Sequence, residues 1–147
     1  MPYSYRDGKI VSRLLLKSGE LSEFAIQKEI IKWSNSILAL RKLVIHIPNE
    51  GKRETITGKN LQSIGMIAGV ADLFIPIARN GYHGIWIEVK SQKGHLSESQ
   101  RIFLSRMEQQ GYLTATVRSL EQFQDIVNRY LKTNSTNMPS SDTVSNI

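Results

Sequence analysis

The stretch "IWIEVKSQKGHLSESQ", residues 85–100, places two charged side chains, Glu88 and Lys90, near the end of an apolar run. The run at 84–90 is rich in β-branched and aromatic residues, which is typical of a strand. Ser97 then opens an amphipathic segment with Gln100 at the capping-box position of a helix. Charged side chains are costly to bury unless they are paired, hydrogen-bonded or bound to a metal. The sequence therefore predicts a strand, a loop and a helix around two charges that need partners.

The two charges are neighbours because of the strand itself. Side chains alternate along a strand, so Glu88 and Lys90 project from one face, whereas Ile85, Ile87 and Val89 project from the other. A Glu-x-Lys pair is compatible with catalysis, but alone it is more often an ordinary ion pair at a strand end. The residues expected near the pair distinguish between these two interpretations.

A second carboxylate is expected beside the first. The run "VADLFIPI", residues 70–77, predicts another strand, and the following Asn80-Gly81 is a strong hairpin signal. An antiparallel hairpin would bring Asp72 close to Glu88. Two nearby carboxylates repel and raise one pKa unless a divalent cation lies between them, and carboxylate oxygens with open water positions suit Mg²⁺ or Mn²⁺. The alternative is that Asp72 only forms hydrogen bonds at the start of a strand.

The remaining pattern predicts an α/β fold. Helical spacing, β-branched runs and serine caps predict a helix at 23–40 capped by Ser22, a strand at 42–47, one helical turn at 57–64, a helix from Ser97 to Gly111, a strand at 112–117 and a helix capped by Ser119. A strand, a helix and another strand imply a parallel crossover. We therefore expect an α-β-β-β-α-β core with a mixed sheet flanked by helices.

Length and composition limit the class of protein. With 147 residues and 40% hydrophobic content, the chain suits one domain with a real core. The absence of cysteine excludes a disulfide framework and any thiolate metal site. No stretch approaches membrane-spanning length, and no long apolar segment opens the chain. These features predict a cytoplasmic protein without a membrane partner.

The charge is basic and unevenly distributed. The formal net charge is +6, and residues 1–60 carry eleven Lys and Arg against six Asp and Glu, whereas the remainder carries eight against seven. A basic cluster favours a polyanionic partner such as nucleic acid, although a merely basic protein remains the alternative. We expect a basic N-terminal arm at 1–21, one domain at 22–131, and a disordered polar tail at 132–147.

The order of Asp72, a hairpin, Glu88-x-Lys90 and a helix with Gln100 resembles the PD-(D/E)xK nuclease superfamily. The local sequence is similar to the VRR-NUC family of that superfamily, in the compact stand-alone form found in bacteria and phages. The similarity covers roughly residues 22–131, through the segments "SEFAIQKEIIKW", "IPNEGKR", "GMIAGVADLFI", "GIWIEVKSQKGHLSESQ" and "GY" before the last strand. The resemblance implies a restriction-endonuclease-like core.

The resemblance also implies roles for individual residues. Asp72 and Glu88 would ligate Mg²⁺ or Mn²⁺, with the Val89 carbonyl as a further ligand. Lys90 would orient or activate the attacking water and contact the phosphate. Gln100 would lie at the edge of the active site.

Two positions qualify this assignment. Glu23, on the first helix, could complete the metal environment, but an acid in a first helical turn also interacts favourably with the helix dipole. The family more often has Pro before the metal-binding Asp, whereas this chain has Ala71. Since proline would shape the backbone and bind no metal, the departure affects the pose of Asp72 and not the ligand set.

The resemblance implies a metal-dependent, structure-specific DNA endonuclease that resolves four-way (Holliday) junctions as a homodimer, in DNA recombination and repair. A symmetric dimer would place two active sites across a two-fold junction. The first helix and the basic loop at 49–63 are the candidate surfaces for DNA and the partner. The alternatives are a nuclease for flaps, nicks or general duplex, and a non-catalytic DNA-binding protein on the same fold.

Overall fold

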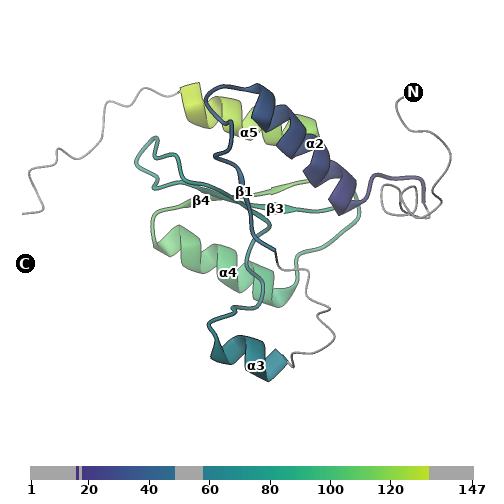
Figure 1. Ribbon diagram of the computed structural model, residues 1–147, viewed down its shortest axis with the longest axis vertical. Helices are drawn as coiled ribbons and strands as arrows, with labels where there is room; N and C mark the ends of the chain where they lie inside the picture. The colour runs from purple at the N-terminus through teal and green to yellow at the C-terminus, as the bar shows by residue number, and fades with distance from the viewer. Residues whose placement is uncertain (1–15, 17, 49–57, 133–147) are drawn as a thin grey trace, which may run out of the picture.

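The computed structural model describes residues 16, 18–48 and 58–132, and its elements form an α/β fold (Figure 1). In chain order they are α2 (Glu23–Ser36), β1 (Ile45–His46), α3 (Gly58–Ser63), β2 (Leu73–Ile75), β3 (Ile85–Val89), α4 (Glu98–Gln109), β4 (Leu113–Val117) and α5 (Leu120–Lys132). The four strands form one sheet in the order β1-β2-β3-β4. The first two pairs are antiparallel and β3 pairs parallel to β4, so the predicted mixed sheet is confirmed.

Helices cover both faces of the sheet. Figure 1 shows α2 and α5 on one face and α4 on the other, with α3 beyond α4. The main core lies under α2 and α5 and contains Ile26, Ile30, Leu40, Leu73, Ile75, Ile85, Ile87, Val89, Val117, Phe123, Val127 and Tyr130. A smaller cluster on the α4 side is built on Ala71, Phe103 and Leu104, against which Trp86 packs. The central strand β3 is thus covered on both sides.

The hairpin between β2 and β3 forms at the predicted turn. Asn80 and Gly81 have φ values of 53° and 80°, as a type I′ turn requires. The ladder pairs Leu73 with Ile87, so the residues just before and just after them, Asp72 and Glu88, stand opposite each other. Sequence-based pairing of the two carboxylates therefore agrees with the sheet register.

Two predicted elements are shorter than expected. The first helix ends at Ser36 and not at Leu40, because Asn35 directs the next turn: its backbone oxygen accepts from Arg41 Nε and its side-chain oxygen accepts from the Lys42 N–H. Lys42 has a positive φ of 59°, which delays the start of the strand. The expected strand at 42–47 is therefore limited to Ile45–His46.

The second and third strands are also trimmed, from 70–77 to Leu73–Ile75 and from 84–90 to Ile85–Val89. The helical turn expected at 57–64 is α3. Most of the predicted arm at 1–21 and the tail beyond Lys132 lie outside the described residues. Within the described part of the chain, no helix is long and apolar enough to cross a membrane.

Candidate active site

The end of β3 carries two buried charges. Glu88 is 1% exposed and Lys90 is 8% exposed, in a strand whose alternate residues enter the apolar core. Trp86, which shares the face of Glu88, makes an edge-to-face contact with Phe103 of α4 at 5.0 Å between ring centroids. The sheet thus holds Glu88 and Lys90 where water cannot fully solvate them, and their local partners become decisive.

One oxygen of Glu88 takes both of its contacts. Its Oε1 accepts a hydrogen bond from Gln100 Nε2 at 2.5 Å and lies 3.1 Å from Lys90 Nζ. Its Oε2 is buried and has no hydrogen-bond partner among the described residues. No protein group in the described part of the chain therefore satisfies the second oxygen, an unusual condition for a buried carboxylate.

Asp72 faces this group from the neighbouring strand. Its Oδ2 accepts a hydrogen bond from the Val89 N–H at 2.8 Å. The Val89 N–H lies just beyond the last backbone pair between β2 and β3, and the Asp72 side chain accepts its hydrogen bond. Asp72 thus forms the hydrogen bond expected of a residue at the start of a strand. The same hydrogen bond fixes the Asp72 carboxylate beside Glu88. Asp72 can therefore stabilise the sheet end and also belong to the candidate site.

Burial and repulsion perturb both acids. Burial, followed by the charge of Asp72, raises the pKa of Glu88 from its ordinary 4.5 to about 7, and Lys90 offsets only part of that rise. Burial also raises the pKa of Asp72, partly offset by the Val89 N–H. The two carboxylates thus resist being ionised together unless a positive charge joins them.

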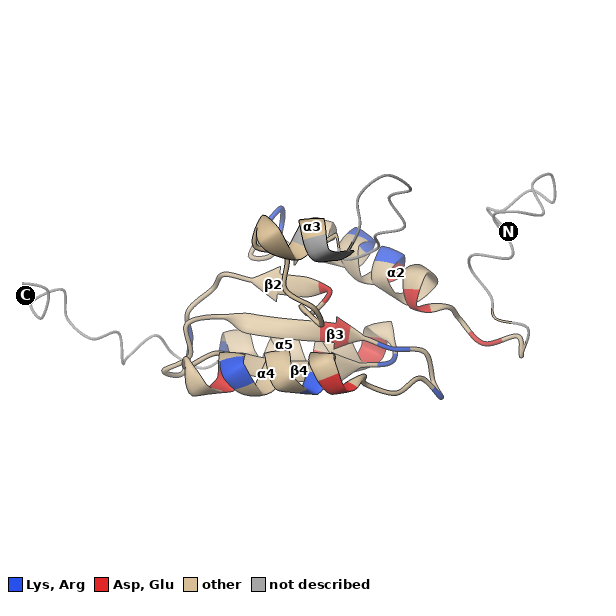
Figure 2. Ribbon diagram, turned by 90° about the horizontal axis from the view of Figure 1, so that it is seen from below, with Lys and Arg blue, Asp and Glu red and all other residues tan. Residues whose placement is uncertain are grey.

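The first turn of α2 adds a third acid near the lysine. Ser22 caps this helix by accepting from the Ala25 N–H at 3.2 Å, which sets Glu23 in the first turn. Glu23 Oε1 lies 3.7 Å from Lys90 Nζ. In Figure 2 the acidic positions at the start of α2, before β2 and at the end of β3 gather at one end of the sheet.

Gln27, one helical turn after Glu23, connects α2 to the sheet. Its Nε2 lies 2.9 Å from His46 Nδ1, which in turn lies 3.1 Å from the Asp72 carbonyl oxygen. The first helix is therefore tied to the strand ends that carry the acids. The structure brings all the side chains predicted for the site, Glu23, Asp72, Glu88, Lys90 and Gln100, to one region.

Comparison with known proteins shows the family to which this chain belongs. The model of the VRR-NUC domain matches residues 8–121. The chain belongs to the VRR-NUC family. A solved structure described as a VRR_NUC domain protein superimposes with a TM-score of 0.68 at 24% identity, covering 77% of this chain and 90% of the other. No curated protein matches this chain.

Membership of the VRR-NUC family identifies a nuclease of the PD-(D/E)xK type, with DNA as its substrate. Nucleases of this family generally use a divalent metal. Among the described residues, no group of three or more His, Cys, Asp or Glu side chains is arranged to hold a metal ion.

The donors fit a hard divalent cation. Mg²⁺ keeps several waters and is commonly bound through one or two carboxylates. Asp72 and Glu88 are two such groups on adjacent strands, and the unpartnered Glu88 Oε2 supplies an oxygen in need of a positive charge. A cation would also remove the repulsion that raises the pKa of Glu88. The residues of this site are thus compatible with the metal that the family implies.

Arg118, just after β4, was missed by the sequence analysis. Its Nη1 donates to the carbonyl oxygens of Ser91, Gln92 and Gly94, at 2.6, 3.2 and 2.7 Å. It therefore holds the loop that connects Lys90 to α4. Nothing in the sequence signals this role, because the three carbonyls lie on a different element and carry no side-chain signature.

Proposed function

We propose that this VRR-NUC protein is a Mg²⁺- or Mn²⁺-dependent, structure-specific DNA endonuclease that resolves four-way junctions as a homodimer. The observation that carries the proposal is the opposition of Asp72 and Glu88 beside Lys90, with Glu88 Oε2 buried and unpartnered. Structural ion pairs seldom leave a buried carboxylate oxygen bare next to a second acid. In a cation-dependent reaction the two acids would bind the metal and Lys90 would orient the attacking water.

In this proposal Asp72, Glu88 and the Val89 carbonyl would hold the cation, and Glu23 would complete its environment. The cation, when bound, lowers the pKa of a coordinated water and neutralises charge on the phosphate. Lys90 Nζ, kept in place by Glu88 at 3.1 Å, orients the attacking water and contacts a phosphate oxygen. Water attacks phosphorus, the phosphodiester bond breaks, and the leaving oxygen takes up a proton.

Gln100 and Arg118 act on the geometry of the site. Gln100 holds Glu88 Oε1 at 2.5 Å, which would leave Oε2 available as the ligand of the cation. Arg118 holds the loop after Lys90 through three carbonyls. Small displacements of reacting groups cost large factors in rate, so both residues are expected to affect turnover without contacting the phosphate.

Exposed apolar side chains support self-association. Leu38, Leu43 and Ile45 are 83%, 40% and 42% exposed, and they lie between the end of α2 and β1. β1 is an edge strand of the sheet, and an edge presents unpaired backbone groups. A second copy of the chain meeting this surface would give the symmetric dimer that two paired cuts in a junction require.

The test is cleavage of end-labelled DNA by the wild type and Lys90→Ala, with Mg²⁺, Mn²⁺ or EDTA. The substrates are a four-way junction, a flap, a nicked duplex and a linear duplex, and light scattering gives the mass in solution. We expect paired symmetric cuts in the junction, lost with EDTA and in the variant, from a protein of dimer mass.

Other outcomes separate the alternatives. Equal cutting of every substrate would make the protein a general nuclease. Preference for flaps or nicks by a monomer would exclude junction resolution. Tight DNA binding without metal-dependent cutting would reject catalysis and leave a DNA-binding protein on the nuclease fold.

A further inference from the structure

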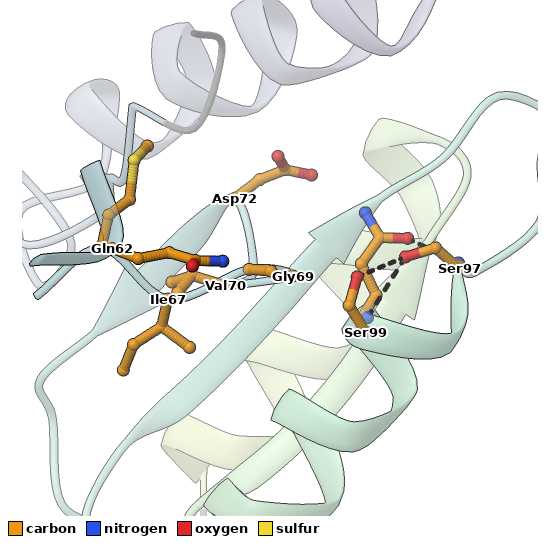
Figure 3. A pocket seen from close by; sticks show the side chains of 10 residues that line it. Gln62, Ile67, Gly69, Val70, Asp72, Ser97 and Ser99 are labelled. Carbon is orange, nitrogen blue, oxygen red and sulfur yellow. Dashed lines mark hydrogen bonds between the residues drawn. The ribbon is translucent and has the colours of Figure 1, made fainter. Parts of the chain in front are cut away.

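A cavity opens directly beside the candidate active site. It has a volume of about 350 Å³ and is bordered by Asp72 and Gln100 (Figure 3). In Figure 3, Gln62 and Ile67 lie on one side of it and Ser97 and Ser99, at the start of α4, lie on the other. Binding pockets for small groups start at roughly 300 Å³, so the space suits one small chemical group and not a helix or strand.

The shape of the cavity is set by a close backbone approach. Gly69 has a φ of 78°, and a Cβ at this position would clash with the carbonyl group of Ser99. The chain before β2 therefore packs directly against the first turn of α4. By contrast, Gly65 has a φ of 92° with nothing near its missing Cβ. The glycine at 69 thus builds the wall between the cavity and the helix, and the glycine at 65 only allows a turn.

The lining suits an uncharged group with polar edges. Met66, Ile67 and Val70 supply apolar surface, and Gln62 supplies an exposed amide. Among the described residues of the lining, Asp72 is the charged one and no Lys or Arg is present. Away from the cation proposed at Asp72, the lining offers no positively charged side chain to a phosphate, so the rest of the cavity suits an uncharged group.

Ile67 gives the cavity an exposed apolar edge. Ile67 is 54% exposed and lines the same cavity as Asp72 and Gln100. Proteins that read an extruded base hold its faces between aromatic or apolar side chains and bond its edge with polar groups. Ile67 with Gln62 provides that combination of surface and hydrogen-bonding atoms.

We propose that this cavity receives an unpaired nucleobase adjacent to the scissile phosphate, so that DNA with an unstacked base is bound in preference to continuous duplex. The inference rests on the proposed nuclease function and assigns a feature of its substrate. Unstacking a base costs free energy in intact duplex and little at a branch or mismatch. The cavity would therefore favour branched or mismatched DNA over continuous duplex without distinguishing base sequences.

The test combines deletion of a base with deletion of a side chain. A branched DNA is prepared with single abasic sites at successive positions around the cut, and its affinity is measured by fluorescence anisotropy with Ca²⁺ in place of Mg²⁺. Wild type, Ile67→Ala and Ile64→Ala are compared. Ile64 is 76% exposed and lies outside the cavity lining, which makes it a matched control.

We expect one abasic position to weaken wild-type binding about five- to tenfold, in the range of single-base stacking contacts. Ile67→Ala should weaken binding to intact DNA similarly and lose no further affinity at that abasic position, since both changes remove one contact. Ile64→Ala should keep the wild-type dependence. Additive effects of the two deletions, or no sensitive position, would overturn the proposal.

Cleavage of the same DNA with Mg²⁺ separates this inference from the proposed function. Cleavage without coupling between Ile67 and a base would reject the base site and keep the nuclease. Coupling without cleavage would support the base site and reject the catalytic function.

Discussion

The chain contains two ion pairs of almost equal length in opposite environments. Lys90 and Glu88 are 3.1 Å apart with side chains 10% and 2% exposed, whereas Arg129 and Asp125 are 3.0 Å apart with side chains 79% and 58% exposed. The second pair spans one turn of α5 in water, where such pairs contribute about 0.3–0.5 kcal/mol. In the first, losing one partner leaves a buried charge uncompensated. The N···O distance therefore does not distinguish the two pairs, whereas their burial does.

Lys90→Met should produce the largest difference between the two pairs. Removing the group that orients the attacking water should lower the single-turnover cleavage rate by about 10²–10⁴-fold, the usual range for a positioned proton-transfer group. The measurement is cleavage of a branched DNA with Mg²⁺. Arg129→Met is the matched control, since it removes a cation from the solvated pair. Equal rates in the two variants would contradict a catalytic role for Lys90.

Gln100→Ala should have the next largest effect. The variant removes the bond to Glu88 Oε1, and loss of a group that orients a metal ligand typically costs about 10- to 100-fold in activity or metal affinity. Ser97→Ala is informative beside it, because it deletes the helix cap, worth about 1 kcal/mol, and keeps the Gln100–Glu88 bond. If both variants lost cleavage only in proportion to lost stability, Gln100 would be a helix cap alone.

The buried pair should also make stability depend on pH. Because the folded-state pKa of Glu88 is about 7 against an ordinary 4.5, the folded protein binds more protons than the unfolded chain between these values. Its free energy of unfolding, measured without divalent cations, should thus fall as pH rises from about 4.5 to 7. Asp72 acts in the same direction, since its pKa is also raised.

Thermal unfolding at pH 5 to 8 checks this prediction. Glu88→Gln should flatten the decrease of Tm with pH. Mg²⁺ should raise the Tm of the wild type more at pH 8 than at pH 5, because the cation binds the ionised carboxylates. An unchanged pH slope in Glu88→Gln would show that other groups control it.

Arg129→Ala should have the smallest effect. Loss of the solvated pair with Asp125 should lower the free energy of unfolding by no more than about 0.5 kcal/mol, and less at high salt. Denaturant unfolding at low and high salt measures it. A cost above about 1 kcal/mol would mean that the aliphatic stem of Arg129 also contributes packing.

Patterns confined to neighbouring residues predicted much of the fold. The Asn80-Gly81 turn, the Ser97 cap with Gln100, and the parallel crossover through α4 follow from local rules, and the structure confirms them. The same hairpin geometry led to the pairing of Asp72 with Glu88. Strand and helix ends were less predictable, because the Asn35 contacts that redirect the chain after α2 leave no periodic signal.

Long-range backbone contacts of the site left no signal in the sequence. In the sequence, Arg118 resembles an ordinary surface arginine after a strand. Only the fold brings three carbonyls of the loop between β3 and α4 to its guanidinium group. Gly69 reads as a loop glycine like Gly65, yet it alone of the two touches another element. Sequence indicates which side chains carry chemistry, whereas the residues that shape the surrounding backbone require coordinates.

The Gln100 side chain belongs to two bonds at once. Its Oε1 accepts from the Ser97 N–H at 2.9 Å and its Nε2 donates to Glu88. Helix ends open far more often than protein cores do. Each opening of the first turn of α4 that displaces Gln100 therefore breaks the bond to Glu88 as well and leaves Lys90 as the remaining contact of Oε1.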